Sequence, residues 1–221
     1  MKIKSGSNYT MYIPDHPTRM VIYFNAHIAF PTSNGRKSRT KYNFREEVCD
    51  AIYDEKTIVF AGLYSKKILE IIIQNTISYS IEETIVSGWS VGGNDAITVA
   101  ASLVNKVPMI KVLLIDSNHT NNITDGVFKK LKSIEISNVS NNLNKTKIKK
   151  LEKVLNTGLF KDYLLLSLPK DFKGSHHRYC RDSTLNNHLY NYVFGGPLDQ
   201  SKYKVYKWDP KKKEMILNGR S

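Results

Sequence analysis

The fold is decided by the stretch Thr84-Ile-Val-Ser-Gly-Trp-Ser-Val-Gly-Gly93. It begins as a β-branched run, which favours a buried strand. The residues after it, up to about residue 104, are expected to form a helix whose small residues allow close packing on the sheet. Between the two lies the pattern Gly88-x-Ser90-x-Gly92, so the sequence predicts a sharp bend with a serine at its apex.

A serine at such a bend has a strained backbone, and its flanks must lack side chains. Gly88 and Gly92 meet that requirement. The helix expected at about residues 91–104 would direct backbone N–H groups at a substrate oxygen. This strand, turn and helix form the layout of a nucleophile elbow, in which Ser90 attacks a carbonyl carbon. The alternative is a coincidental Gly-x-Ser-x-Gly in an ordinary turn.

The length and composition predict one globular domain over residues 1–221, because 221 residues with 41% apolar content can bury a substantial core. No window approaches the eighteen apolar residues of a membrane span, and the start of the chain lacks the apolar run of a secretory signal. We therefore expect no membrane span and a cytoplasmic location. Cys49 and Cys180 show no metal or disulfide pattern, and we interpret them as incidental thiols.

Predicted strands and helices alternate along the chain, which indicates a parallel sheet flanked by helices. The fold class is therefore α/β: a mostly parallel sheet with helices on both faces, arranged as a three-layer sandwich. We expect an edge strand at 8–13, further strands at 19–24, 56–61, 84–89, 110–115, 132–137 and 162–168, the last of these ending the sheet, and helices near 42–54, 64–76, 91–104 and 143–155.

A formal charge of +13 makes the chain basic, and eleven lysines against four acidic residues lie in 127–173. Within that segment, Leu143, Ile148, Leu151 and Leu155 fall near one side of a helix and lysines on the other. Such a face is usually only solvated. The functional alternative is attraction to a polyanion such as nucleic acid, an anionic wall polymer or a membrane surface.

A serine hydroxyl needs a histidine to accept its proton and a carboxylate to hold that histidine. Asp116 ends the strand 110–115, which would run parallel to the elbow strand and stop at the same edge. Asp171, which follows the strand 162–168, is the rival acid, and Asp116 as a turn residue is the structural alternative.

The base is expected in the loop 173–181, where Gly174 and Ser175 lead into two adjacent histidines. We favour His177 and keep His176 as the alternative base. The pair lacks the spacing of a zinc hydrolase, so we predict no metal and no cofactor.

An oxyanion hole requires two backbone donors. We expect the N–H of Val91, directly after the nucleophile, and a second donor from Asn25 or Ala26, which follow the strand 19–24. The side-chain amide of Asn25 is an alternative donor, and a plain turn at Asn25 is the structural one.

With the elbow Gly-Trp-Ser-Val-Gly-Gly, the oxyanion loop Phe-Asn-Ala-His at 24–27 and the order Ser90, Asp116, His177, the chain resembles the α/β-hydrolase superfamily. The resemblance implies a serine hydrolase, of the esterase and lipase type, with an acyl-enzyme intermediate. The room for a lid is only the short segment at about 117–131, which suggests a small, lidless member acting on hydrophilic or polymeric esters.

The function expected from these residues is carboxylic ester hydrolysis, with removal of acetyl groups from a polymer as one version. Two other classes stay open. One is a catalytically inactive member that binds a polyanion through its basic face. The other is a thioesterase, acyltransferase or amide hydrolase that uses the same residues.

Overall fold

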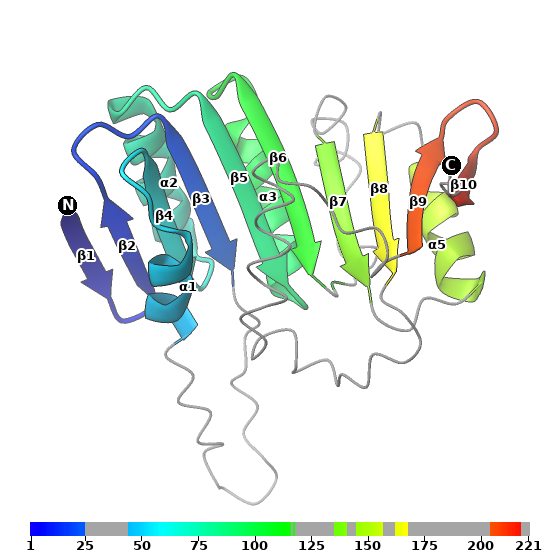
Figure 1. Cartoon of the computed structure of the whole chain (residues 1–221), viewed down its shortest axis with the longest axis horizontal. Coiled ribbons are helices and arrows are strands. Elements are labelled where there is room, and N and C mark those ends of the chain that lie inside the picture. The colour runs from blue at the N-terminus through cyan, green and yellow to red at the C-terminus, as the bar shows by residue number, and fades with distance from the viewer. Residues whose placement is uncertain are drawn as a thin grey trace, which may run out of the picture.

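The computed structural model describes residues 1–24, 44–115, 117, 135–140, 145–156, 162–167 and 204–217. Within these ranges, ten strands form one continuous sheet in the order β1-β2-β4-β3-β5-β6-β7-β8-β9-β10. Figure 1 shows this sheet face-on, with helix α1 in front of it and helices α2 and α3 behind. The predicted three-layer α/β arrangement, mostly parallel with helices on both faces, is confirmed.

The six central strands run parallel to one another. Parallel strands covered on both faces need continuous apolar runs, and β-branched residues supply them here. The strands are β3 (Arg19–Phe24), β4 (Thr57–Gly62), β5 (Glu83–Trp89), β6 (Met109–Ile115), β7 (Glu135–Ser140) and β8 (Asp162–Ser167). The expected strands are confirmed, with β7 lying three residues later than predicted.

Two antiparallel hairpins extend the sheet at its edges. At one end, β1 (Lys2–Gly6) and β2 (Tyr9–Ile13) pair closely, and β2 pairs with β4. The prediction that residues 8–13 form an edge strand is therefore wrong. Four of the five β2 residues are buried, because β1 covers the outer side of β2.

The other hairpin consists of β9 (Lys204–Asp209) and β10 (Glu214–Leu217), and β9 pairs antiparallel with β8. The prediction that the strand starting at Asp162 ends the sheet is wrong. Lysines interrupt the apolar pattern of β9, and this hid a strand in which Val205 and Trp208 are buried.

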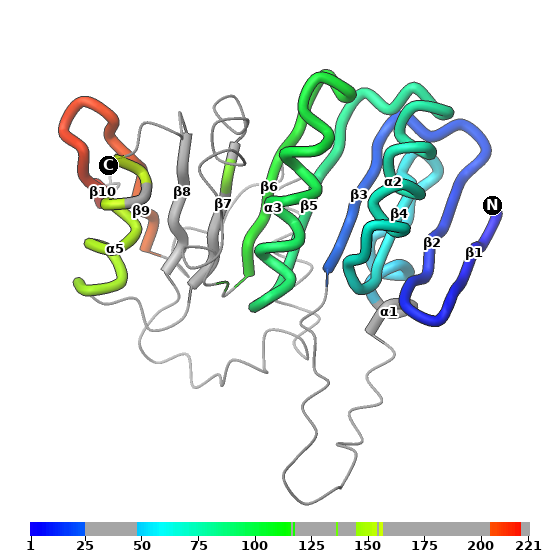
Figure 2. The backbone as a smooth tube through the Cα atoms, turned by 180° about the vertical axis from the view of Figure 1, so that it is seen from behind, coloured from blue at the N-terminus to red at the C-terminus, as the bar shows by residue number. Residues whose placement is uncertain are grey.

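One face of the sheet is covered by α2 (Lys66–Ser78), α3 (Gly92–Leu103) and α5 (Lys145–Leu155), and the opposite face carries α1 (Phe44–Ile52). Figure 2 shows the first three from behind. Helix α2 starts where the Ser65 side chain accepts the N–H of Ile68 at 3.2 Å. No helix within the described ranges is long and apolar enough to cross a membrane.

The hydrophobic core lies between the sheet and α2, α3 and α5. Helix α3 approaches closely through Ala96 and Ala100, both fully buried. Helix α5 turns Leu151 and Leu155 inward, as predicted from their spacing, and they share this core with Trp208 of β9. The predicted amphipathic helix is confirmed for these residues, whereas Leu143 lies outside the described part of the chain.

Candidate active site

The bend predicted at Ser90 is present. Strand β5 ends at Trp89, Ser90 has a φ of 54°, and α3 begins at Gly92. A positive φ places a residue with a side chain in the left-handed region, which costs roughly 1–3 kcal/mol at a functional site. The structure therefore holds Ser90 in a conformation that its neighbours must stabilise.

Two glycines provide the space for this bend. A Cβ added at Gly88 would overlap the backbone carbonyl of Gly92 and lie 2.7 Å from the backbone nitrogen of Gly93. A Cβ added at Gly93 would overlap the side chain of Ser117. The sequence analysis identified Gly88 but missed Gly93, since Ser117 approaches that glycine only in the folded protein.

Two contacts hold the bend against the end of β6. The backbone N–H of Ser90 donates to the carbonyl of Ile115 at 3.0 Å, and Ser117 packs on Gly93. Ile115, the last residue of β6, and Ser117 lie on either side of position 116 in the chain. Asp116 itself lies outside the described residues, but both its chain neighbours contact the bend.

Helix α3 begins at Gly92, so its N-terminus lies next to Ser90. The N–H of Gly93 donates to the carbonyl of Ser90 at 3.1 Å, and the N–H of Asn94 donates to that of Val91 at 3.0 Å. The first N–H groups of a helix have no partner within the helix, and Val91 provides no side-chain cap. Val91 is 51% exposed and Ser90 is partly exposed, so this helix end is accessible to a small molecule.

Strand β3 lies beside the elbow strand, as predicted. Its last residue, Phe24, is paired with Gly88, two residues before Ser90. The chain therefore leaves β3 next to the bend, where the sequence analysis expects the second oxyanion donor. Asn25 and Ala26, the two candidates for that donor, lie outside the described residues.

The remaining candidates are also outside the described part of the chain: Asp116, the rival acid Asp171, and the two possible bases His177 and His176. The topology fixes only the strands that precede them. β6 and β8 run parallel to β5, so all three end at the same edge of the sheet. Across the described ranges, no three His, Cys, Asp or Glu side chains are grouped to hold a metal ion.

Comparisons with solved structures identify the architecture. An α/β hydrolase enzyme from the metagenome of lagoon sediments at Mar Chica, Morocco, superimposes with a TM-score of 0.54 at 13% identity, covering 88% of this chain and 98% of that one. Est1E from Butyrivibrio proteoclasticus, solved with ferulic acid bound, gives 0.51 at 9% identity, covering 84% and 95%.

This chain has the α/β-hydrolase fold, which the sequence resemblance implied. No family model matches the sequence, and no curated protein matches it either. At identities this low the likeness concerns the fold.

Proposed function

We propose that this protein is a serine hydrolase that cleaves carboxylic esters through an acyl-enzyme on Ser90. The observation that carries the proposal is the positive φ of Ser90 between β5 and α3, since a non-glycine residue in that region needs a reason. A nucleophile that must project from the edge of a sheet supplies one. The superimposed protein from the Mar Chica metagenome is named an α/β hydrolase enzyme, which supports the same class of reaction.

The proposed acid is Asp116 and the proposed base is His177, with His176 as the alternative base. Support for Asp116 comes from its neighbours, because Ile115 accepts the N–H of Ser90 and Ser117 packs on Gly93. Support for a histidine from the segment after β8 is its position in the chain, nine or ten residues after Ser167, the last residue of a strand that ends at the same edge as β5.

In the reaction, Ser90 Oγ bonds to the ester carbonyl carbon and its proton passes to the histidine. The tetrahedral oxyanion accepts the N–H of Val91 and a donor from Asn25 or Ala26. The C–O bond to the alcohol then breaks, and the histidine returns the proton to the leaving oxygen. A water molecule next attacks the carbonyl carbon of the acyl-enzyme and gives a proton to the histidine. The bond between that carbon and Ser90 Oγ then breaks, and the histidine returns the proton to Oγ, which releases the carboxylic acid and restores Ser90.

The proposed substrates are hydrophilic or polymeric esters, with deacetylation as one version. The support is the limited chain length between β6 and β7, where a large lid would need to be inserted. We expect short acyl esters to be hydrolysed faster than long ones. A preference for acyl chains of about ten or more carbons would contradict this part of the proposal.

The central experiment is covalent labelling with a fluorophosphonate probe, followed by mass spectrometry of the labelled peptide. We expect the label on Ser90, and we expect Ser90→Ala to lose both the label and hydrolysis of p-nitrophenyl acetate. Ser80→Ala is the matched control, because Ser80 also has a positive φ, 51°, but lies in the turn after α2. Labelling that persists in Ser90→Ala would contradict the proposal.

The partners of Ser90 are tested by single substitutions. His177→Ala should lower kcat by about a thousandfold or more, whereas His176→Ala should be milder. Asp116→Asn should reduce kcat steeply while the unfolding midpoint stays close to that of the wild type. Full activity in Asp116→Asn would move the acid to Asp171, and a reversed histidine result would move the base to His176.

A further inference from the structure

Lysines from two parts of the chain meet at one edge of the sheet. Helix α5 carries five of them and the β9–β10 hairpin carries five more, with only three acidic residues among the 26 residues of 145–156 and 204–217. We call this surface the basic edge; its lysines are Lys145, Lys147, Lys149, Lys150, Lys153, Lys204, Lys207, Lys211, Lys212 and Lys213, all exposed. Its net charge of +7 is more than half of that of the whole chain.

Two of the three acidic side chains at the basic edge are engaged by backbone groups. Glu152 accepts the N–H of Met215 at 2.9 Å, which ties α5 to β10. Asp209 accepts the N–H groups of Lys211 and Lys212 at 2.8 and 3.1 Å, which closes the hairpin turn. The backbone hydrogen bond from Lys212 lowers the pKa of Asp209 against a smaller opposing effect of desolvation. These two carboxylates therefore hold α5 and the hairpin turn in place, and they also offset part of the positive charge.

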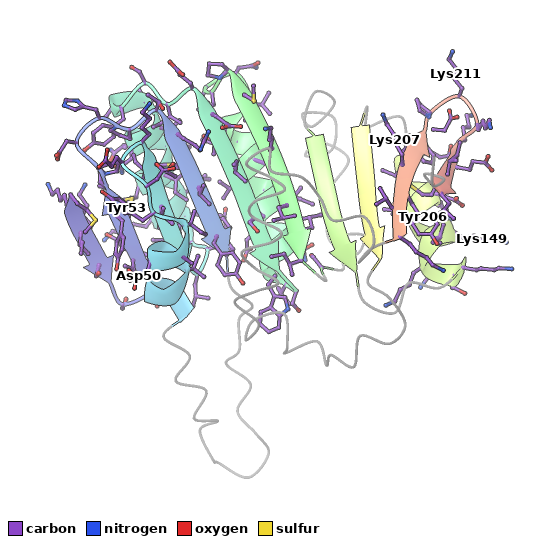
Figure 3. All side chains as sticks on the ribbon, in the orientation of Figure 1. Asp50, Tyr53, Lys149, Tyr206, Lys207 and Lys211 are labelled. Carbon is purple, nitrogen blue, oxygen red and sulfur yellow. The ribbon has the colours of Figure 1, made fainter. Side chains whose placement is uncertain are left out.

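The lysines extend outward from a folded platform. Figure 3 shows Lys149 and Lys211 pointing away from the sheet, from α5 and from the hairpin respectively. The apolar side of α5 is already used, since Leu151 and Leu155 are buried in the core. The apolar side chains of α5 that the structure describes are therefore turned to the core and not to a lipid bilayer, which disfavours a membrane partner.

The side chains at the basic edge also argue against a surface that reads nucleic-acid bases. It contains no arginine, so it lacks the bidentate donors that recognise guanine. Trp208 is buried and Tyr206 is partly buried against the core, so neither aromatic ring is placed to stack on a nucleic-acid base. What remains is a row of point charges suited to anionic groups spaced along a polymer.

The strand register relates the basic edge to Ser90. Trp89, Ile115, Val139, Leu166 and Val205 occupy one row across the sheet. Ser90 follows Trp89, and Lys204 precedes Val205 in a strand of opposite direction, so both are the next residues toward the same edge. Four strand spacings separate them, or about 19 Å at roughly 4.8 Å each.

Helix α5 places a second lysine toward that edge. Asn156, which follows the last residue of α5, donates to the carbonyl of Lys213 at 3.4 Å. Lys213 lies in the hairpin turn, at the amino ends of the parallel strands and so on the side away from Ser90. The helix therefore starts, at Lys145, from the end nearer to Lys204. A ligand that reaches both Ser90 and these lysines has to span about 19 Å, which an extended polymer does and a small ester does not.

We infer that the substrate is an acylated anionic polysaccharide whose carboxylate groups bind the basic edge while an ester group lies at Ser90. This inference rests on the proposed function and names the substrate class for the same site. The lysines would hold the polymer by charge alone, so binding should be salt-sensitive and independent of the order of its sugars.

The test uses the full chain and the triple variant Lys145→Gln, Lys149→Gln, Lys204→Gln. The matched control, Lys2→Gln, Lys56→Gln, Lys106→Gln, removes the same charge from exposed positions elsewhere. Titration with unesterified polygalacturonate measures binding without catalysis. We expect the triple variant to bind at least tenfold more weakly. The slope of log binding constant against log salt concentration should become about 2 less steep, because each of the three lost charge contacts contributes roughly 0.7, the value for single-stranded nucleic acids.

Hydrolysis adds a second measurement. The ratio of kcat/KM on acetylated polygalacturonate to that on p-nitrophenyl acetate should fall about tenfold in the triple variant, through KM, and should not change in the control. Acetylated dextran, which has an uncharged backbone, should show no such fall.

The outcomes separate the two proposals. A wild type that does not hydrolyse p-nitrophenyl acetate contradicts the proposed function, while the binding titration still judges the basic edge. Equal polygalacturonate binding by the triple variant and the control overturns the inference. So does tighter binding, at equal salt, to a 20-base-pair DNA duplex or to vesicles containing phosphatidylserine, since the basic edge would then serve a different partner.

Discussion

Ser90 is held in a left-handed backbone conformation by the atoms around it. The carbonyl of Ile115 accepts its N–H, and the absence of side chains at Gly88 and Gly93 lets the first turn of α3 fold back against the strand. The strain at one residue is therefore compensated by three others. The proposed reaction of Ser90 therefore depends on the missing side chains at Gly88 and Gly93 as much as on the serine hydroxyl group.

Gly88→Ala should destabilise the protein by about 2–4 kcal/mol, because the new Cβ would overlap backbone atoms of Gly92 that cannot rotate away. Urea unfolding at 25 °C measures the free energy of unfolding, and fluorophosphonate labelling measures whether the bend survives.

Gly6→Ala is the control for that substitution. Its Cβ would approach only the ring of Tyr9, which is a movable side chain, at 2.7 Å. We expect a loss below about 1 kcal/mol there. A Gly88→Ala protein as stable and as readily labelled as the wild type would show that the bend relaxes without cost.

Helix α5 and the β9–β10 hairpin stabilise each other at one end of the sheet. A pair of antiparallel strands is marginal by itself, and a lysine-rich helix of eleven residues is too. Their packing places Leu151, Leu155, Trp208 and Met215 in the common core. The basic edge therefore exists only when both elements are folded.

Leu155→Ala should lower the free energy of unfolding by about 2–5 kcal/mol, because the side chain is 1% exposed and its removal leaves a cavity. Thermal or urea unfolding measures the loss, and amide exchange in β10 should accelerate with it. Leu217→Ala, at a position 51% exposed, is the matched control and should change stability by under about 1 kcal/mol. Equal effects from the two substitutions would argue against this packing.

Across the whole sheet, the two ends of the parallel strands carry different groups of residues. The carboxyl ends carry Ser90, whereas the amino ends carry an ion pair network centred on Glu83 of β5. Glu83 Oε2 lies 2.7 Å from Arg19 Nε of β3, and Oε1 lies 3.0 Å from Lys111 Nζ of β6. One carboxylate thus connects three neighbouring strands far from the candidate active site.

Acid should weaken this network. Burial alone would raise the pKa of Glu83, but the hydrogen bonds and charges of Lys111 and Arg19 outweigh it, and the pKa lies below the ordinary 4.5. A lowered folded-state pKa means that the stabilisation is present above about pH 4.5 and is lost as the pH falls through that value toward the folded pKa.

Glu83→Gln should therefore cost about 1–2 kcal/mol at pH 7 and much less at pH 3, as measured by urea unfolding over that pH range. Glu82→Gln, at the exposed neighbouring position, removes the same charge and should cost less at pH 7. A Glu83→Gln loss that stays constant with pH would mean that the charge of Glu83 is not the source of the stabilisation.

Local patterns in the sequence were sufficient for much of the fold. Long apolar runs predicted the central strands, the Gly88-x-Ser90 pattern predicted the bend, and the spacing of Leu151 and Leu155 predicted the buried side of α5. These features depend on residues close together in the chain. Strand β9 was missed because lysines interrupt its apolar residues, and β2 was placed at the edge because its covering strand β1 is short and polar.

By itself, the sequence determined that a serine stands on a tight turn between a buried strand and a helix, because glycine, β-branched and small residues act through local sterics. Only the tertiary structure decided that Ser117 closes on Gly93, that Glu83 joins three strands, and that lysines some 60 residues apart form one surface. The reason is that strand order and register bring distant residues together, and no local preference of the chain encodes those distances.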